Sequence, residues 1–279
     1  MAIMKKLLLV IVVAILMTLG IVDTVQAVQI YGETKPLGKG TVRTWVKLDD
    51  YGHPLDIGVS FTKAALSGLP TESDEIEDYP QKLMLMDGSG HPTFEYELTF
   101  PKEVSVAPFT HVGFNWNPQG HTPKGIFSWP HFDIHFYMMN SEERYAITAT
   151  DDNFLEKAYK TPPEKFVAEG YFPAPMSAEP RMGVHWVDTT SPEFHGETFT
   201  KAIIYGFYDG EIVFFESMIT RDFLMSQPNT TAPIKQVAAY PKDGYYPTEY
   251  SINYDANSEE YAVSLNGLTF RVATSASLS

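Results

Sequence analysis

The sequence of 279 residues contains no cysteine. This absence excludes disulfide bonds, thiolate metal ligands, thiol nucleophiles and a lipid anchor on an N-terminal cysteine. Basic side chains are also scarce, with 20 Lys and Arg against 35 Asp and Glu and a formal net charge of −15. Because nucleic acid and anionic lipid are bound mainly through Lys and Arg contacts with phosphate, this balance argues against both partners.

Several common catalytic motifs are also missing. The chain has no G-x-S-x-G nucleophile turn, no glycine-rich phosphate-binding loop and no H-E-x-x-H helix motif. These motifs mark serine hydrolases, nucleotide-binding enzymes and helical zinc proteases, respectively. Any chemistry must therefore come from a different arrangement of side chains.

Residues 1–27 have the composition of a secretory signal peptide. Lys5 and Lys6 precede an apolar run over residues 7–19, and residues 25–27 (VQA) offer a cleavage site with small residues. The apolar run is shorter than the roughly 20 residues that a membrane-spanning helix needs. We therefore expect cleavage before Val28, no stable membrane anchor afterwards, and a periplasmic or extracellular location.

The remaining chain, residues 28–279, is predicted to form a single β-rich domain, with residues 234–279 as a possible C-terminal meander subdomain. Alternating apolar and polar residues and hairpin turns such as Asp209-Gly210 predict many short strands. These strands are expected at residues 40–49, 55–61, 81–86, 94–100, 182–187, 199–208, 211–219, 250–254, 260–265 and 268–272. The fold class is mainly β, a β-rich α+β fold with antiparallel sheets or a barrel-like sandwich and two or three short helices.

Four further segments carry specific expectations. Residues 144–148 are expected to form the antiparallel neighbour of the strand around residues 131–137. Residues 151–159 are predicted to form a helix capped by Asp151 or Asp152. The proline-rich residues 160–181 are expected to form a loop with little regular structure, and residues 229–233 a linker.

The most informative stretch is residues 120–137, GHTPKGIFSWPHFDIHFY. Because successive side chains of a strand point to opposite faces, His131, Asp133 and His135 share one face. The aromatic and aliphatic residues between them share the other. We expect the apolar face to belong to the core and the polar face to be a solvent-accessible wall of a site.

The geometry of a strand limits how these three polar residues can act. Residues two apart are separated by roughly 6.6 Å, so that both can reach one ion, whereas His131 and His135 are roughly 13 Å apart. One ion cannot easily take all three residues. Either Asp133 pairs with one histidine while the other faces a second site, or a bulge brings them together.

Other strands supply further candidate ligands. Glu216 is a carboxylate within an otherwise apolar strand, where burial without a partner would be costly. Imidazole and carboxylate ligands suit zinc, iron, copper or manganese. The predicted residues of a divalent-metal site are His131, Asp133, His135 and His185, with Glu216 and His121 as further ligands or supporting groups.

Alternatives to metal binding remain open at this stage. Each histidine could be a hydrogen-bonded structural residue, or Asp133 could orient a histidine for acid–base catalysis without metal. The protein could be a non-enzymatic oligomer that binds a small ligand or serves envelope stress, or it could bind carbohydrate through Trp129 or Trp186. Whether it is an enzyme is undecided; a metal enzyme would most naturally use activated water or oxygen.

Five stretches carry a resemblance to a known family. They are residues 116–123 (WNPQGHTP), 130–137 (PHFDIHFY), 182–186 (MGVHW), 205–210 (YGFYDG) and 215–218 (FESM). Residues 61–70 and 246–268 look similar too, so the resemblance covers most of the mature chain. They resemble an exported bacterial family of unknown function. The family is typified by a Thermus protein that is controlled by a sigma/anti-sigma pair and assembles as a decamer. The resemblance implies a β-rich fold, export and a homo-oligomer, and it assigns no catalytic role.

Overall fold

The computed structural model describes residues 27–77 and 79–274. Residues 1–26 of the predicted signal peptide lie outside the described residues. The elements are β1 (Val28–Tyr31), β2 (Lys35–Leu37), β3 (Gly40–Leu48), β4 (Pro54–Thr62), η1 (Lys63–Leu66), β5 (Gln81–Met84), β6 (Pro92–Thr99), β7 (His111–Asn117), β8 (His131–Tyr137), α1 (Ser141–Tyr145), α2 (Phe154–Ala158), η2 (Glu164–Phe166), β9 (Tyr171–Glu179), β10 (Gly183–Asp188), η3 (Pro192–His195), β11 (Lys201–Tyr208), β12 (Glu211–Thr220), α3 (Arg221–Met225), β13 (Asn229–Pro233), β14 (Gly244–Tyr246), β15 (Glu249–Asp255), β16 (Glu260–Asn266) and β17 (Thr269–Arg271).

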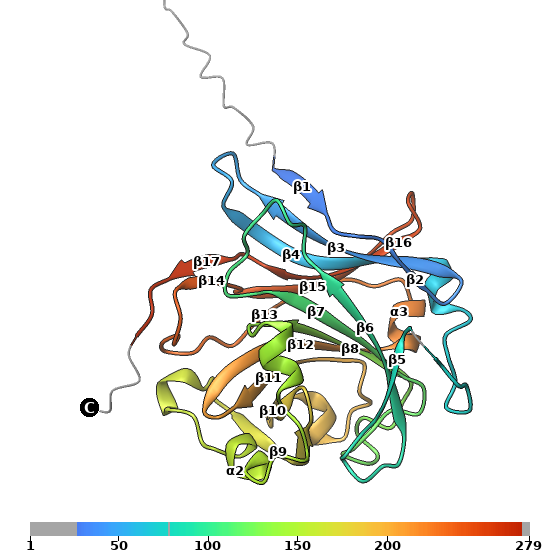
Figure 1. Ribbon diagram of the computed structural model, residues 1–279. Coiled ribbons are helices and arrows are strands. Elements are labelled where there is room, and N and C mark those ends of the chain that lie inside the picture. The colour runs from blue at the N-terminus through green and yellow to red at the C-terminus, as the bar shows by residue number, and fades with distance from the viewer. Residues whose placement is uncertain (1–26, 78, 275–279) are drawn as a thin grey trace, which may run out of the picture.

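Two large sheets face each other (Figure 1). One has the strand order β1-β3-β4-β16-β15-β13, with β2 also paired to β3, and the other has the order β5-β6-β7-β8-β12-β11-β10-β9. A small third sheet joins β14 to β17. Every pairing is antiparallel. The predicted β-rich fold class with antiparallel sheets and two or three short helices is confirmed, with three α-helices among the described residues.

The main core lies between these two sheets. Phe61 of β4 packs its ring 5.6 Å from that of Phe114 on β7 and 6.2 Å from that of Phe132 on β8. Ile134 and Phe136 of β8 are also fully buried in this cluster. The apolar face of β8 therefore packs toward the seven-stranded sheet, as the alternation of its sequence predicted. The C-terminal strand β16 pairs with β4 in that same sheet.

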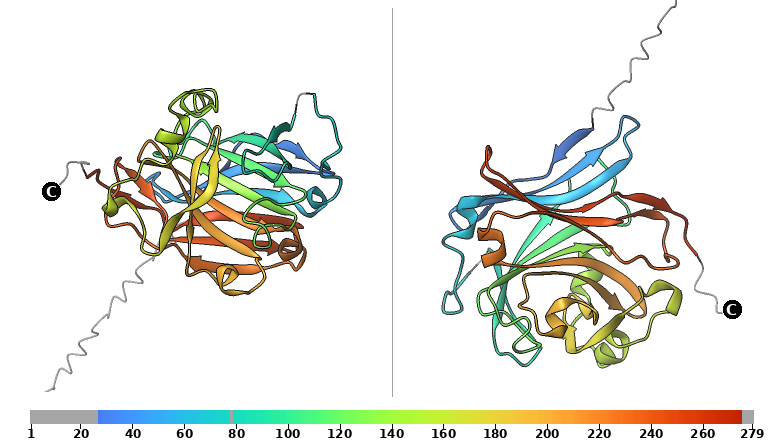
Figure 2. Two further views of the ribbon diagram at one scale, coloured as in Figure 1. Left: turned by 90° about the horizontal axis from the view of Figure 1, so that it is seen from below. Right: turned by 180° about the vertical axis from the view of Figure 1, so that it is seen from behind.

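The eight-stranded sheet curls into a half-barrel (Figure 2), and side chains link its two edge strands. Glu179 at the end of β9 accepts hydrogen bonds from the backbone N–H of Met86, just beyond β5, with N–O distances of 2.8 and 3.0 Å. Arg181 donates to the side chain of Gln81 on β5. These side-chain bonds bring together edges that no backbone ladder joins.

Residues 144–148 do not form the strand that was expected beside β8. The neighbours of β8 are β7 and β12, and residues 141–145 form helix α1 instead. Asn140 caps this helix by accepting from the N–H of Glu143, whose side chain accepts from the N–H of Asn140. This reciprocal capping box stabilises a helix start, and the strand expectation overlooked it.

Two segments expected to be irregular are strands. Residues 171–179 form β9, paired with β10, and residues 229–233 form β13, paired with β15. Both are edge strands, where a proline is tolerated because one side of the strand needs no N–H donors. The prolines were therefore a sign of a sheet edge.

The predicted helix at residues 151–159 is present in shorter form as α2. Its N-cap is Asn153, whose side chain makes no capping bond, so neither predicted aspartate caps it. Asp151 instead accepts from the N–H of Asn153 and from Lys157. Among the described residues, no helix has both the length and the apolar character needed to span a membrane.

The first prediction concerns the contact between the sheets. We expect Phe61→Ala to lower the free energy of unfolding by about 3–5 kcal/mol, because it opens a cavity among fully buried rings. Urea unfolding measures the loss. Tyr51→Ala, at a side chain that is 86% exposed, is the control and should change stability by less than about 0.5 kcal/mol. Equal effects of the two changes would contradict this account of the core.

The second prediction concerns the link between the edge strands. Burial raises the pKa of Glu179 to about 7, and the nearby Asp87 carboxylate also raises it, against the opposing Met86 hydrogen bond. Because this folded-state pKa lies above the unfolded value of roughly 4.3, the protonated form of Glu179 stabilises the fold at acid pH. That contribution is lost as the pH rises through 7. Between pH 5 and 8, the wild type should therefore lose roughly 2–3 kcal/mol relative to Glu179→Gln.

Urea unfolding of both proteins at several pH values tests this prediction. Because the other titrating groups are shared, their contributions largely cancel in the difference between the two unfolding free energies. Parallel stability curves for wild type and variant would show that Glu179 does not hold its proton in this way.

Candidate metal centre

The polar face of β8 lies inside the half-barrel. Its side chains were expected to be accessible to solvent, but His131, Asp133 and His135 are only 0%, 5% and 1% exposed. The expectation was wrong because the eight-stranded sheet curls over this face. On the flanking strands, the register places Asn115 of β7 beside Asp133 and Glu216 of β12 beside His135.

The first group of ligand atoms, the first triad, consists of His121, His131 and Asp133. The Nε2 atom of His121 lies 3.2 Å from Asp133 Oδ2, and that of His131 lies 3.1 Å from Asp133 Oδ1. The two Nε2 atoms are 3.0 Å apart. Asn117 donates to Asp133 Oδ2 at 2.6 Å. Three ligand atoms thus converge on one point in the interior.

Backbone carbonyls determine which ring nitrogens of this triad face inward. His121 Nδ1 donates to the carbonyl oxygen of Thr122 at 2.7 Å, and His131 Nδ1 donates to that of Trp129 at 2.6 Å. Because a carbonyl only accepts, both Nδ1 atoms carry hydrogen and the Nε2 lone pairs of the neutral rings point at each other and at Asp133. This is how metal-ligating histidines are usually oriented.

The distances within the first triad also suit a metal ion. Ligand bonds of about 2.0–2.1 Å place neighbouring atoms of a tetrahedral site roughly 3.3 Å apart. The observed separations of 3.0–3.2 Å are close to that value. The donor set and its spacing therefore fit a divalent cation.

The loop between β7 and β8 holds His121 in position. Gly120 has φ of +68°, and a Cβ there would lie 2.2 Å from the carbonyl oxygen of Phe127, so only glycine fits. The N–H of His121 donates to that same oxygen at 3.0 Å. The N–H of Thr122 donates to Asp87 Oδ2 at 2.9 Å, which ties the loop to the turn after β5.

The second group, the second triad, consists of His135, His185 and Glu216. Glu216 Oε2 lies 3.6 Å from His135 Nε2 and 3.5 Å from His185 Nε2. His185 on β10 donates from Nδ1 to the carbonyl oxygen of Ser177 at 3.1 Å, so its Nε2 faces the carboxylate. Among the described residues, His135 Nε2 and Glu216 Oε2 have no hydrogen-bond partner, which is unusual for buried polar atoms.

Burial makes the second triad favour its uncharged form. It lowers the pKa of His185 to about 4. It also lowers the pKa of His135 well below its ordinary value, and repulsion from His185 lowers it further. Burial raises the pKa of Glu216 well above its ordinary range, with the Asp133 charge adding to the effect. Without an ion, burial therefore favours neutral imidazoles and a protonated carboxyl group in this triad.

The first triad favours charge instead. Burial alone would raise the pKa of Asp133, but attraction to His131 and His121 outweighs it and holds that pKa well below its usual range. Burial would likewise lower the pKa of His121, but the hydrogen bond and charge of Asp133 outweigh it, so that pKa is raised. The two triads therefore have opposite electrostatic characters although they share strand β8.

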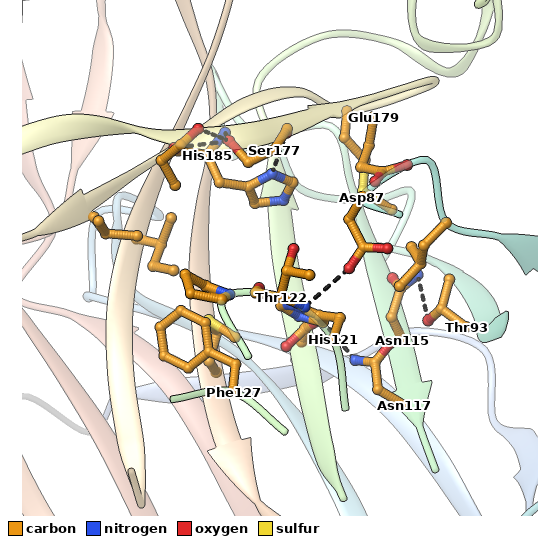
Figure 3. Close-up of a pocket in the computed structure, with 18 of the residues that line it drawn as sticks. Asp87, Thr93, Asn115, Asn117, His121, Thr122, Phe127, Ser177, Glu179 and His185 are labelled. Carbon is orange, nitrogen blue, oxygen red and sulfur yellow. Dashed lines mark hydrogen bonds and ion pairs between the residues drawn. The ribbon is translucent and has the colours of Figure 1, made fainter. Parts of the chain in front are cut away.

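A cavity of about 40 Å³ lies between the triads. His121 and Asp133 of the first triad and His135 and His185 of the second line it. Figure 3 shows His121, His185 and the amide side chains of β7 converging on this space from different elements. The remaining lining residues are Leu85, Asp87, Thr93, Asn115, Asn117, Thr122, Pro123, Phe127, Ala174, Ser177, Glu179, Met182, Val187, Ile204 and Met218.

A buried ionic network beside the second triad was missed. The fully buried Arg144 of α1 pairs with Glu95 and with Glu97 of β6, the latter at 3.2 Å. Its guanidinium lies 4.2 Å from the ring centre of Tyr137, which stacks on His135 at 5.5 Å. The period-two spacing of the two glutamates was a usable sequence signal, because it resembles that of the β8 ligands. Nothing local indicated that Arg144 would be buried.

One further histidine and the two tryptophans considered for carbohydrate binding lie outside the triads. His111 belongs to neither triad and stacks on Tyr137, with ring centres 4.9 Å apart. Trp186, considered for carbohydrate binding, borders a groove of about 990 Å³ but is only 9% exposed. Its ring therefore offers little surface for a sugar, whereas Trp129 is 51% exposed.

Part of the chain matches a known protein family. Residues 49–116 match the model of a family described as TTHB210-like, hypothetical protein TTHB210, which supports the family resemblance carried by the sequence motifs. The matched segment ends before His121 and so includes none of the six triad residues. No curated protein and no solved structure matches the chain.

Proposed function

We propose that this protein binds divalent metal ions through the two triads. The observation that carries the proposal is the first triad, where two histidine Nε2 atoms and one carboxylate lie 3.0–3.2 Å apart. In the neutral rings, whose Nδ1 hydrogens are donated to backbone carbonyls, the Nε2 lone pairs of His121 and His131 face the Asp133 carboxylate. A divalent cation relieves this repulsion.

We assign one ion to each triad. His131 and His135 lie on the same strand but belong to different groups of ligand atoms. Each triad provides three protein ligands from imidazole and carboxylate, a set that suits zinc, iron, copper or manganese. Three protein ligands leave a coordination position open, as in catalytic rather than structural sites.

The surrounding residues would support these ions. The carbonyls of Thr122, Trp129 and Ser177 hold three of the imidazoles in the ligating tautomer, and Asn117 orients the Asp133 carboxylate. An ion with an open position supplies Lewis acidity that activates bound water or polarises a substrate oxygen. If the protein is an enzyme, that is the chemistry the site favours.

The competing explanation is a metal-free polar pocket. In it, a protonated His121 would pair with Asp133, and a protonated Glu216 would donate a hydrogen bond to a neutral imidazole. Such a pocket needs no cation, and the protein would then act as a binding or envelope-stress protein. Metal content separates the two explanations.

The third prediction is the metal content of the purified protein. Protein prepared without an affinity tag or chelator, or reconstituted with zinc or manganese, should contain two ions per chain by elemental analysis. His121→Ala removes one ligand from the first triad, and His185→Ala removes one from the second. Both side chains are partly exposed. Each should lower the content to about one ion per chain, because two remaining ligands hold a divalent ion poorly.

His53→Ala and His195→Ala are the matched controls, since neither residue belongs to a triad. Both should keep two ions per chain. Far-UV circular dichroism establishes that each variant is folded. A wild type that takes up no zinc, iron, copper or manganese, or triad variants that keep full metal content, would refute metal binding at these residues.

We also propose that the protein is exported and forms a homo-oligomer. The N-terminal segment with Lys5, Lys6 and an apolar run supports export, and the resemblance to the exported family supports oligomerisation.

As a fourth prediction, the protein from its native host should be recovered outside the cytoplasm with Val28 at its N-terminus, as determined by mass spectrometry. Light scattering should give a mass several times that of one chain. Cytoplasmic protein that begins at Met1 would contradict export, and a monomer at micromolar concentration would contradict assembly.

A further inference from the structure

The cavity between the triads is too small for most organic substrates. Its volume is about 40 Å³, which holds roughly three water molecules. Sites for drug-sized ligands measure about 300–1,000 Å³. The buried side chains of Ile204 and Met218 and the ring of Phe127 form an apolar part of its wall. This volume favours a ligand of two or three non-hydrogen atoms.

The polar wall of the cavity offers hydrogen-bond acceptors. Asn117 donates its Nδ2 hydrogen to Asp133, and Asn115 donates its own to Thr93 at 3.4 Å. The Oδ1 atoms of both asparagines are buried and have no partner among the described residues. Because an ionised carboxylate only accepts hydrogen bonds, the amide nitrogen of Asn117, and not its oxygen, must be the atom that faces Asp133. A ligand that carries O–H or N–H groups would satisfy these oxygens.

Metal ions in the triads would require a ligand that has lone pairs. His121 and Asp133 of one triad and His135 and His185 of the other line the cavity. An ion in each triad would present its open coordination position to a lone pair. A suitable ligand therefore has lone pairs for the ions and hydrogens for the two asparagines.

We propose that this cavity binds one small protic ligand, of the size and chemistry of hydrogen peroxide or hydroxylamine, between two metal ions. The inference rests on the proposed function, because it requires both triads to hold an ion. It goes beyond metal binding by restricting the substrate class to molecules of two or three non-hydrogen atoms that donate hydrogen bonds. The oxygens of Asn115 and Asn117 then select protic ligands, and the apolar wall selects for size.

Titration of the cobalt(II)-substituted protein with hydroxylamine tests the proposal. The visible absorption of cobalt(II) reports ligand binding, and elemental analysis reports cobalt content separately. We expect saturable binding of one hydroxylamine per chain. N,N-Diethylhydroxylamine, which keeps the O–H group but is larger, should leave the spectrum unchanged.

Two variants probe the wall without removing a metal ligand. Asn115→Leu removes an acceptor and should weaken hydroxylamine binding about tenfold, the value of one lost hydrogen bond of roughly 1.4 kcal/mol. Ala174→Leu adds side-chain volume to the cavity wall and should abolish binding. Both should keep two cobalt ions per chain. Asn257→Leu, in an exposed turn, is the control and should bind hydroxylamine as the wild type does.

The outcomes distinguish this inference from the proposed function. Two bound cobalt ions with no spectral response to hydroxylamine, or an equal response in wild type and Ala174→Leu, would overturn the inference and leave metal binding standing. Failure of the wild type to bind cobalt, zinc or manganese would overturn the proposed function and the inference with it.

Discussion

Burial of strand β8 on both faces is the constraint on which the rest of the site depends. All seven of its residues are buried, yet every second one is polar or carries a phenol. A buried polar group without a partner costs roughly 1–3 kcal/mol, so the interior must supply partners for each of them. The amides of β7, the carboxylate of β12, the loop carrying His121 and the ionic network of Arg144 all lie against this one strand.

Three polar clusters follow one another along β8, and each solves the burial problem differently. Around Asp133, the imidazoles of His121 and His131 and the amide of Asn117 surround a carboxylate whose pKa is held well below its usual range. Around His135, the groups favour their uncharged forms. At Tyr137, the aromatic ring contacts the stacked imidazoles of His111 and His135 and the fully buried Arg144 guanidinium, which pairs with two glutamates. The cavity lies between the first two clusters, where the electrostatic character changes from charged to neutral.

Much of this arrangement followed from local patterns. The alternation of polar and apolar residues in β8 predicted which side chains share a face. The rise per residue of a strand predicted that His131 and His135 lie too far apart to bind one ion easily. The isolated carboxylate of Glu216 in an apolar strand already required a partner. Edge strands β9 and β13 were missed because proline weighs against a strand unless its place at the edge of the sheet is known.

The sequence alone determined the strand periodicity, the donor types and the absence of thiol chemistry, because each depends on neighbouring residues or on composition. Tertiary structure decided the pairing of ligands. Glu216 meets His135 through the register of β12 on β8, and His185 reaches them from β10 because the sheet curls. Register and curvature arise from long-range pairing and packing between distant segments, so no local pattern contains them. The same curvature buries the polar face of β8, whereas the alternation of its sequence predicted only that this face is polar.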